Sequence, residues 1–145
     1  MTTINRTITN TLSIVFIFVL LAGATGCSKK IMFDPSVVVP GATGKVKVKK
    51  DNNNNFSISI DIINLAEASR LQPQKAFYLV WMQNEQDNTR LLGQLKTSSS
   101  LLSKTLKASL NTVTPYKPLR IFITAEDELN ISNPNGQTVL TTGSF

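Results

Sequence analysis

Few side chains in this sequence could carry out chemistry. The 145 residues include no histidine and a single cysteine, Cys27. The absence of histidine excludes Ser-His-Asp and Cys-His catalysis, and it also excludes histidine-ligated metal sites. One cysteine forms neither an internal disulfide nor a thiolate-rich zinc site. The thiol of Cys27 is therefore the most distinctive reactive group in the chain.

Acidic side chains are densest at residues 126–128, which read Glu-Asp-Glu. A calcium ion takes about six to eight oxygen ligands, usually from several segments, and the turn-rich stretch at 51–55 would have to fold nearby to add to this group. A hydrolase with two carboxylates would need Glu126 to face Asp61 or Asp87 across a cleft, and no cleft is indicated. We expect solvated loop ends here, with no metal, no cofactor and no catalysis.

The single cysteine follows a short apolar segment. Residues 12–22 are apolar apart from Ser13, and residues 23–26 are small. A run of about 11 residues is too short to cross a bilayer as a helix, which takes about 20. It has the length of the apolar core of a secretory signal peptide.

This segment resembles a bacterial lipoprotein signal peptide whose lipobox is Ala24-Thr25-Gly26-Cys27. The resemblance implies cleavage between Gly26 and Cys27, a diacylglycerol on the Cys27 thiol, and an amino terminus acylated by a fatty acid such as palmitate. Such acyl chains, at about 0.8 kcal/mol per buried methylene, make a stable anchor. We expect a signal peptide over 1–26 and a lipid-anchored protein of the cell envelope, on the outer membrane facing the periplasm or at the cell surface. An uncleaved anchor and an ordinary signal peptide are the alternatives.

The net charge of +6 is concentrated near this expected anchor. Between Cys27 and Lys50, six lysines stand against one aspartate, whereas basic and acidic residues are equal in number from 51 to 145. Lysines beside the anchor would meet anionic head groups. Lys45, Lys47 and Lys49 alternate with valines, which predicts the outer face of a strand that lysines protect from edge-to-edge pairing. Because we expect export, the charge does not indicate a nucleic-acid partner.

Residues 44–145 have the pattern of a small antiparallel β-sandwich, whereas residues 27–43 contain Pro35 and Pro40 and predict a lipidated tether. Short alternating or apolar segments are separated by turn signals at roughly sandwich spacing. We expect about seven strands, immunoglobulin-like in the loose sense, over 44–50, 56–62, 76–82, 90–96, 102–110, 119–125 and 137–142. The 101–110 window also fits a helix, because Leu102, Leu106 and Leu110 recur every four residues.

Four short motifs follow one another in the second half of the chain. They are Tyr78-Leu79-Val80-Trp81-Met82, Leu92-Gly93, the segment 121–126 ending in Glu126, and Pro134-Asn135-Gly136 leading into 137–140. With them, residues 45–145 resemble the C-terminal extracytoplasmic domain of anti-sigma-K factors. Members of that family place a cytoplasmic sigma-binding segment and a transmembrane helix before this domain, where this sequence has a lipoprotein signal. The resemblance therefore implies a shared fold and envelope location without anti-sigma activity.

The motif residues have plausible structural roles of their own. We expect Trp81, on a strand apolar on both faces, to lie in the core. Tyr78 points to the face opposite Trp81, so its hydroxyl would reach the surface or tie down a loop. Gly93 predicts a bulge or a close backbone approach.

The sequence as a whole predicts a binding protein rather than an enzyme. We expect a non-enzymatic protein-interaction module in envelope sensing or assembly, engaging an envelope protein through a strand edge or the loops at one end of the sandwich. The alternative is a carbohydrate- or surface-binding lipoprotein, which would present exposed aromatic side chains. Tyr116 is the best candidate for such a side chain.

Overall fold

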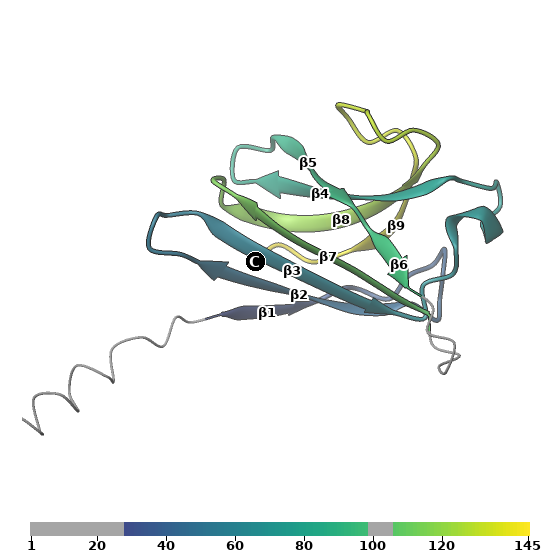
Figure 1. Cartoon of the computed structure of the whole chain (residues 1–145), viewed down its shortest axis with the longest axis horizontal. Coiled ribbons are helices and arrows are strands. Elements are labelled where there is room, and N and C mark those ends of the chain that lie inside the picture. The colour runs from purple at the N-terminus through teal and green to yellow at the C-terminus, as the bar shows by residue number, and fades with distance from the viewer. Residues whose placement is uncertain (1–27, 99–105) are drawn as a thin grey trace, which may run out of the picture.

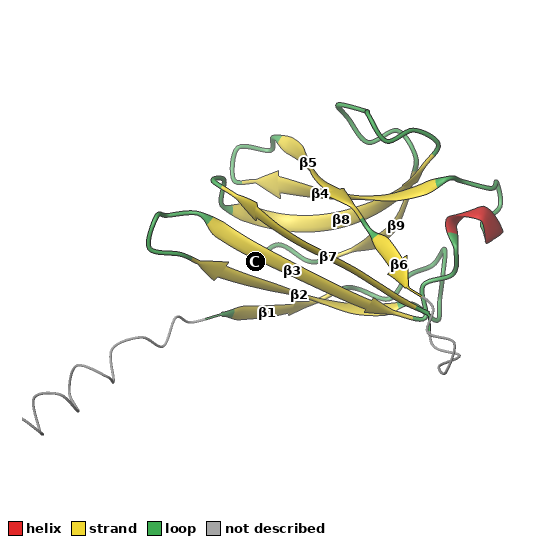
Figure 2. Cartoon of the chain, in the orientation of Figure 1, coloured by secondary structure: helices red, strands yellow, loops and turns green. Residues whose placement is uncertain are grey.

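Two antiparallel β-sheets pack face to face in the computed structural model, which describes residues 28–98 and 106–145 (Figure 1). One sheet has the order β1-β2-β3-β7-β6 and the other β5-β4-β8-β9. The strands are β1 (Lys29–Met32), β2 (Thr43–Lys50), β3 (Phe56–Ile63), β4 (Phe77–Asn84), β5 (Thr89–Gln94), β6 (Lys96–Ser98), β7 (Lys107–Thr114), β8 (Pro118–Glu126) and β9 (Gln137–Thr141). The described part of the chain adds one 3₁₀ turn, Ala68–Arg70 (Figure 2). The predicted β-sandwich is confirmed, with nine strands in the described residues rather than about seven.

None of the helical structure in the described residues is long and apolar enough to cross a membrane.

The strands predicted over 44–50 and 56–62 are confirmed as β2 and β3, which form a hairpin. β2 and β3 pair over their full length around the loop 51–55. Asp51 Oδ1 accepts the backbone N–H groups of Asn53 and Asn55, and Asn54 takes the left-handed backbone conformation that asparagine tolerates. Side chains alternate between the two faces of each strand, so one face of the hairpin is buried against the other sheet. Its buried side chains are Val46, Ile58, Ile60 and Ile62.

β4 is the central strand that its apolar sequence predicts, between β5 and β8. Its inward side chains, Tyr78, Val80 and Met82, belong to the core between the sheets. Its outward side chains are also buried: Leu79 and Trp81 form a second, smaller cluster with Phe122 of β8. The four-stranded sheet is therefore apolar on both faces near its centre.

The chain changes sheets along both sides of the sandwich. On one side, β1 pairs with β2, after which Phe33 bridges to Thr142 and the Asp34 N–H bonds the Thr141 carbonyl, beside β9. On the other side, β5 leaves the four-stranded sheet and continues as β6 beside β7. These crossings connect the two sheets at both sides of the sandwich.

The predicted tether over 27–43 is too long. β1 lies within it, and Phe33, Val39 and Ala42 are buried in the core. Ser36 holds this segment in place, because its hydroxyl donates to the Val139 carbonyl at 2.6 Å and accepts the Val39 N–H at 2.9 Å. The prolines that suggested a tether lie in the loop between β1 and β2. β2 is consequently an interior strand, and its lysines do not protect a sheet edge.

Two other predicted strands differ from the structure. The segment predicted as one strand over 90–96 is divided between β5 and β6, with Leu95 between them. The strand predicted over 102–110 is present as β7 from Lys107 and extends to Thr114, while residues 102–105 lie outside the described residues.

Candidate functional site

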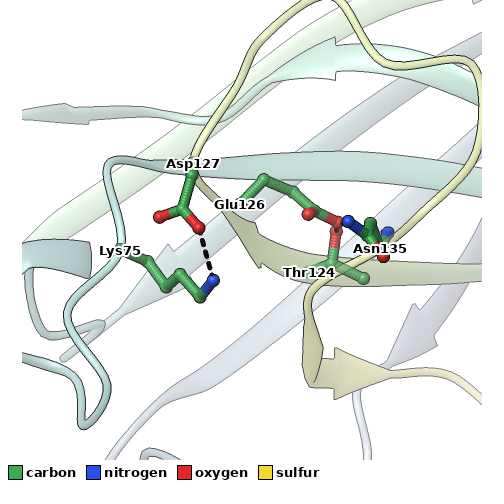
Figure 3. Close-up of polar contacts among 5 residues, drawn as sticks. All are labelled: Lys75, Thr124, Glu126, Asp127 and Asn135. Atoms are coloured by element: carbon green, nitrogen blue, oxygen red, sulfur yellow. Dashed lines mark hydrogen bonds and ion pairs between the residues drawn. The ribbon is translucent and has the colours of Figure 1, made fainter.

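Several motif residues meet in a buried network on the outer face of the four-stranded sheet. Trp81 Nε1–H donates to Thr124 Oγ1 at 2.8 Å, and the Thr124 hydroxyl donates to Glu126 Oε1 at 2.6 Å. The Asn135 backbone N–H donates to the same carboxylate oxygen at 3.1 Å (Figure 3). Glu126 is only 3% exposed. We call Trp81, Thr124, Glu126 and Asn135 the Glu126 network.

The Glu126 network fastens the loop 127–136 to the sheet. At the start of the loop, Lys75 Nζ lies 2.6 Å from Asp127 Oδ2 (Figure 3). At its end, the loop backbone passes so close to β8 that a Cβ on Gly136 would lie 1.8 Å from the Ala125 carbonyl oxygen. Pro134 is partly buried in the same loop. The motif residues Trp81, Glu126 and Gly136 therefore share one structural task, holding this loop against the sheet.

The other two motif residues have separate tasks. Tyr78 is buried on the opposite face of β4, and its hydroxyl donates to the Ala66 carbonyl at 2.9 Å, so it ties down the loop before β4. Burial raises the pKa of Tyr78 to about 12. Gly93 has φ +145° at a bulge where β5 shifts register against β4. The loop-tying role for Tyr78 and the bulge at Gly93 are both confirmed. Trp81 is buried as predicted, but outside the core between the sheets.

Glu126 does not face Asp61 or Asp87. Glu126 is engaged in its network, Asp61 lies on β3 in the other sheet, and Asp87 lies in the turn between β4 and β5. In residues 28–98 and 106–145, no three Asp, Glu, Cys or His side chains gather where they could hold a metal ion. Gly26 and Cys27 lie outside the described residues, which begin at Ser28.

An open hollow lies along the side of the sandwich that β6 does not cover. β5 is the outermost strand of its sheet, and within residues 28–98 and 106–145 β6 pairs with β7 at residues 107–109. Between the start of β5 and the end of β7 is a hollow of about 350 Å³. We call it the edge hollow; its lining is Thr89, Arg90, Leu91, Leu92, Val113, Thr114, Tyr116 and Ser132.

Exposed apolar side chains surround the edge hollow. Val113 is 61% exposed, Tyr116 41% and Leu91 38%. The Arg90 guanidinium lies 4.0 Å from the centre of the Tyr116 ring, so one face of that ring is covered by a cation. An unpaired strand edge beside apolar side chains suits the addition of an extended peptide as a further strand. The sequence drew attention only to Tyr116, because the exposure of Leu91 and Val113 depends on how β5 and β7 are placed at the side of the sandwich.

In comparisons with known proteins, the chain matches no family model, no curated protein and no solved structure.

Proposed function

We propose that this chain is a lipid-anchored extracytoplasmic protein that acts as a non-enzymatic interaction module in envelope sensing or assembly. The apolar segment 12–22 followed by Gly26-Cys27 supports the anchor. The observation that supports partner binding most directly is the edge hollow, where Leu91, Val113 and Tyr116 are exposed beside the outer edge of β5.

The proposed partner is an envelope protein that adds an extended segment to the edge of β5. Backbone hydrogen bonds to the strand would give affinity, and alternate side chains of the segment would enter the edge hollow. This docking edge ends with β5 at Gln94, because β6 begins at Lys96 in the other sheet.

Site-specific photo-crosslinking in intact cells tests this docking mode. A photoreactive phenylalanine derivative replaces Leu91 in the full chain, and the matched control carries it at Ser69, an exposed position in the 3₁₀ turn. We expect a discrete protein adduct from position 91 that is absent from position 69. Identical adducts from both positions, or none from position 91, would overturn docking at β5.

Mass spectrometry of the membrane form tests the anchor separately. We expect a chain that begins at Cys27 and carries the mass of a diacylglycerol on the thiol. An unmodified Cys27, or a retained segment 1–26, would refute the anchor whatever the crosslinking shows.

The resemblance to the C-terminal extracytoplasmic domain of anti-sigma-K factors remains part of this proposal, as does the loosely immunoglobulin-like description. The supporting observation is that Trp81, Glu126 and Gly136, which are named by separate motifs, meet at one point of the sandwich. The proposed relation is one of fold and envelope location, not of anti-sigma activity.

A carbohydrate- or surface-binding lipoprotein is the second candidate, favoured by the exposure of Tyr116. Aromatic rings bind sugars through their flat faces, and one face of this ring lies against Arg90. Glycan-array binding by the full chain, lost in Tyr116→Ala, would support this candidate. Equal binding by both proteins would reject it.

A further inference from the structure

The outer face of the five-stranded sheet carries six of the fourteen basic residues that follow Cys27 in the sequence. Residues paired across neighbouring antiparallel strands point to the same side of a sheet. The strand register therefore brings Lys47 of β2 beside Lys30 of β1, and Ser109 of β7 beside Lys96 of β6. We call this surface the basic face; its charged members are Lys30, Lys45, Lys47, Lys49, Lys96, Lys107 and Asp61.

Charge compensation on the basic face is slight. Among the described residues, its one ion pair joins Lys45 to Asp61 at 3.9 Å, and six lysines against one aspartate give a net charge of +5. Elsewhere Arg70, Lys75 and Lys117 each lie beside a carboxylate. Positive charge is thus spread over one flat surface.

A trough runs through this surface. The short side chains of Ser57 and Ser59 on β3 form its floor, between Lys47 and Lys49 of β2 and the longer side chains of β7. Its volume is about 460 Å³, and Ser28 lines one end. The surface inside the trough is mainly apolar, and Lys47 and Lys49 at its border supply ammonium donors that suit phosphate oxygens.

The trough also lies where the chain would enter the membrane. Ser28 directly follows Cys27, and β1 begins one residue later at the outer edge of the same sheet. With so short a connection, an anchor at Cys27 holds the basic face near the bilayer surface. Its lysines would then lie within the short range, about one Debye length, over which anionic head groups attract cations.

We infer that the basic face docks on the anionic phospholipid head groups of the membrane that holds Cys27, with head-group phosphates at the lysines that border the trough. This inference rests on the lipid anchor of the proposed function. It assigns the sandwich an orientation in which the five-stranded sheet lies on the bilayer and the four-stranded sheet faces away from it.

Lysine acetylation of the full lipidated chain in vesicles tests the orientation. One vesicle set is phosphatidylcholine alone, and the other contains about 30 mol% phosphatidylglycerol, enough to create a negative surface potential. In the anionic vesicles we expect labelling of Lys45, Lys47 and Lys49 to fall by about threefold or more, and to recover at about 1 M NaCl, where the Debye length is about 3 Å. Lys75 and Lys117, which lie outside the basic face, should label equally in both.

Two double variants that remove the same charge distinguish an effect of the basic face from an effect of the total charge of the protein. Lys47→Gln/Lys49→Gln should abolish the protection of Lys45, whereas Arg70→Gln/Lys117→Gln removes the same charge from exposed positions elsewhere and should leave it unchanged. Equal labelling in both vesicle types, or equal effects of the two double variants, would overturn the docking. Protection seen only in native envelopes would reassign the face to another polyanion. Because vesicle flotation reports the anchor independently, floating protein without lysine protection refutes the docking alone.

Discussion

Thr124 is the position at which the Glu126 network is most directly tested. Its hydroxyl accepts the indole N–H of Trp81 and donates to Glu126, and both Trp81 and Thr124 are at most 1% exposed. Thr124→Val keeps the shape of the side chain but removes both bonds. It leaves the indole N–H buried without a partner, which costs about 1–3 kcal/mol, and it removes a bond to a carboxylate worth about 1.5–3 kcal/mol.

We expect Thr124→Val to lower the free energy of unfolding by about 3 kcal/mol, which still leaves a domain of ordinary stability folded. Urea denaturation of the full chain in detergent, followed by circular dichroism, measures the loss. With an m-value of about 2 kcal/mol per molar urea, the midpoint should fall by about 1.5 M.

Two further variants show whether the hydrogen bonds are responsible. Thr124→Ser keeps the hydroxyl and loses one methyl, so it should cost only about 1 kcal/mol. Trp81→Phe should cost less in the Thr124→Val background than in the wild type, because its N–H is already unpaired there. A Thr124→Val protein as stable as Thr124→Ser, or within about 0.5 kcal/mol of wild type, would refute the reasoning.

Three other predictions concern the loop, the core tyrosine and the orientation at the membrane. Gly136→Ala should destabilise the domain by about 2 kcal/mol or more, because its Cβ would lie 1.8 Å from a backbone oxygen. The control is Gly143→Ala, which has open space around it; its free energy of unfolding should stay within about 0.5 kcal/mol of the wild-type value in the same denaturation assay. Stability should fall by about 2 kcal/mol as pH rises from 10 to 12, because the unfolded chain ionises Tyr78 before the folded chain, whose Tyr78 pKa is about 12. Tyr78→Phe should remove this component of the pH profile. Maleimide should modify Ser59→Cys more slowly in anionic than in neutral vesicles while modifying Leu91→Cys equally in both, and equal rates for Ser59→Cys would contradict the orientation.

The sequence predicts the individual strands better than their arrangement. Alternation around 56–62 and the doubly apolar segment 76–82 predict β3 and β4, because a strand half-buried or fully buried has a period of two or an unbroken apolar run. Nothing local shows that Lys29–Met32 pairs with β2, since those four residues depend on a partner more than ten residues away. The prediction that residues 27–43 form a tether was wrong for this reason.

In the candidate site, too, some residues are noticeable in the sequence and others acquire their role only from the arrangement of the strands. Trp81 and Glu126 are noticeable residues in the sequence, and Gly93 carries its own signal because a glycine inside a strand pattern indicates a bulge. Thr124, which joins Trp81 to Glu126, is an ordinary residue of an apolar strand and acquires its role only from the register of β4 against β8. The edge hollow depends on how the start of β5 and the end of β7 lie relative to each other, which no residue of either strand specifies.

The two proposed surfaces follow from one feature of the fold, the passage of the chain from β5 to β6. Among the described residues, β6 joins the five-stranded sheet beside residues 107–109, so it adds Lys96 to the basic face and leaves the end of β7 uncovered by any described strand. That uncovered end supplies Val113, which lines both the trough and the edge hollow. A peptide added to β5 would therefore lie along the side of the sandwich, adjacent to the docked face but not on it. Membrane docking and partner binding can thus occur together, and a partner that reaches β5 would itself have to lie close to the bilayer.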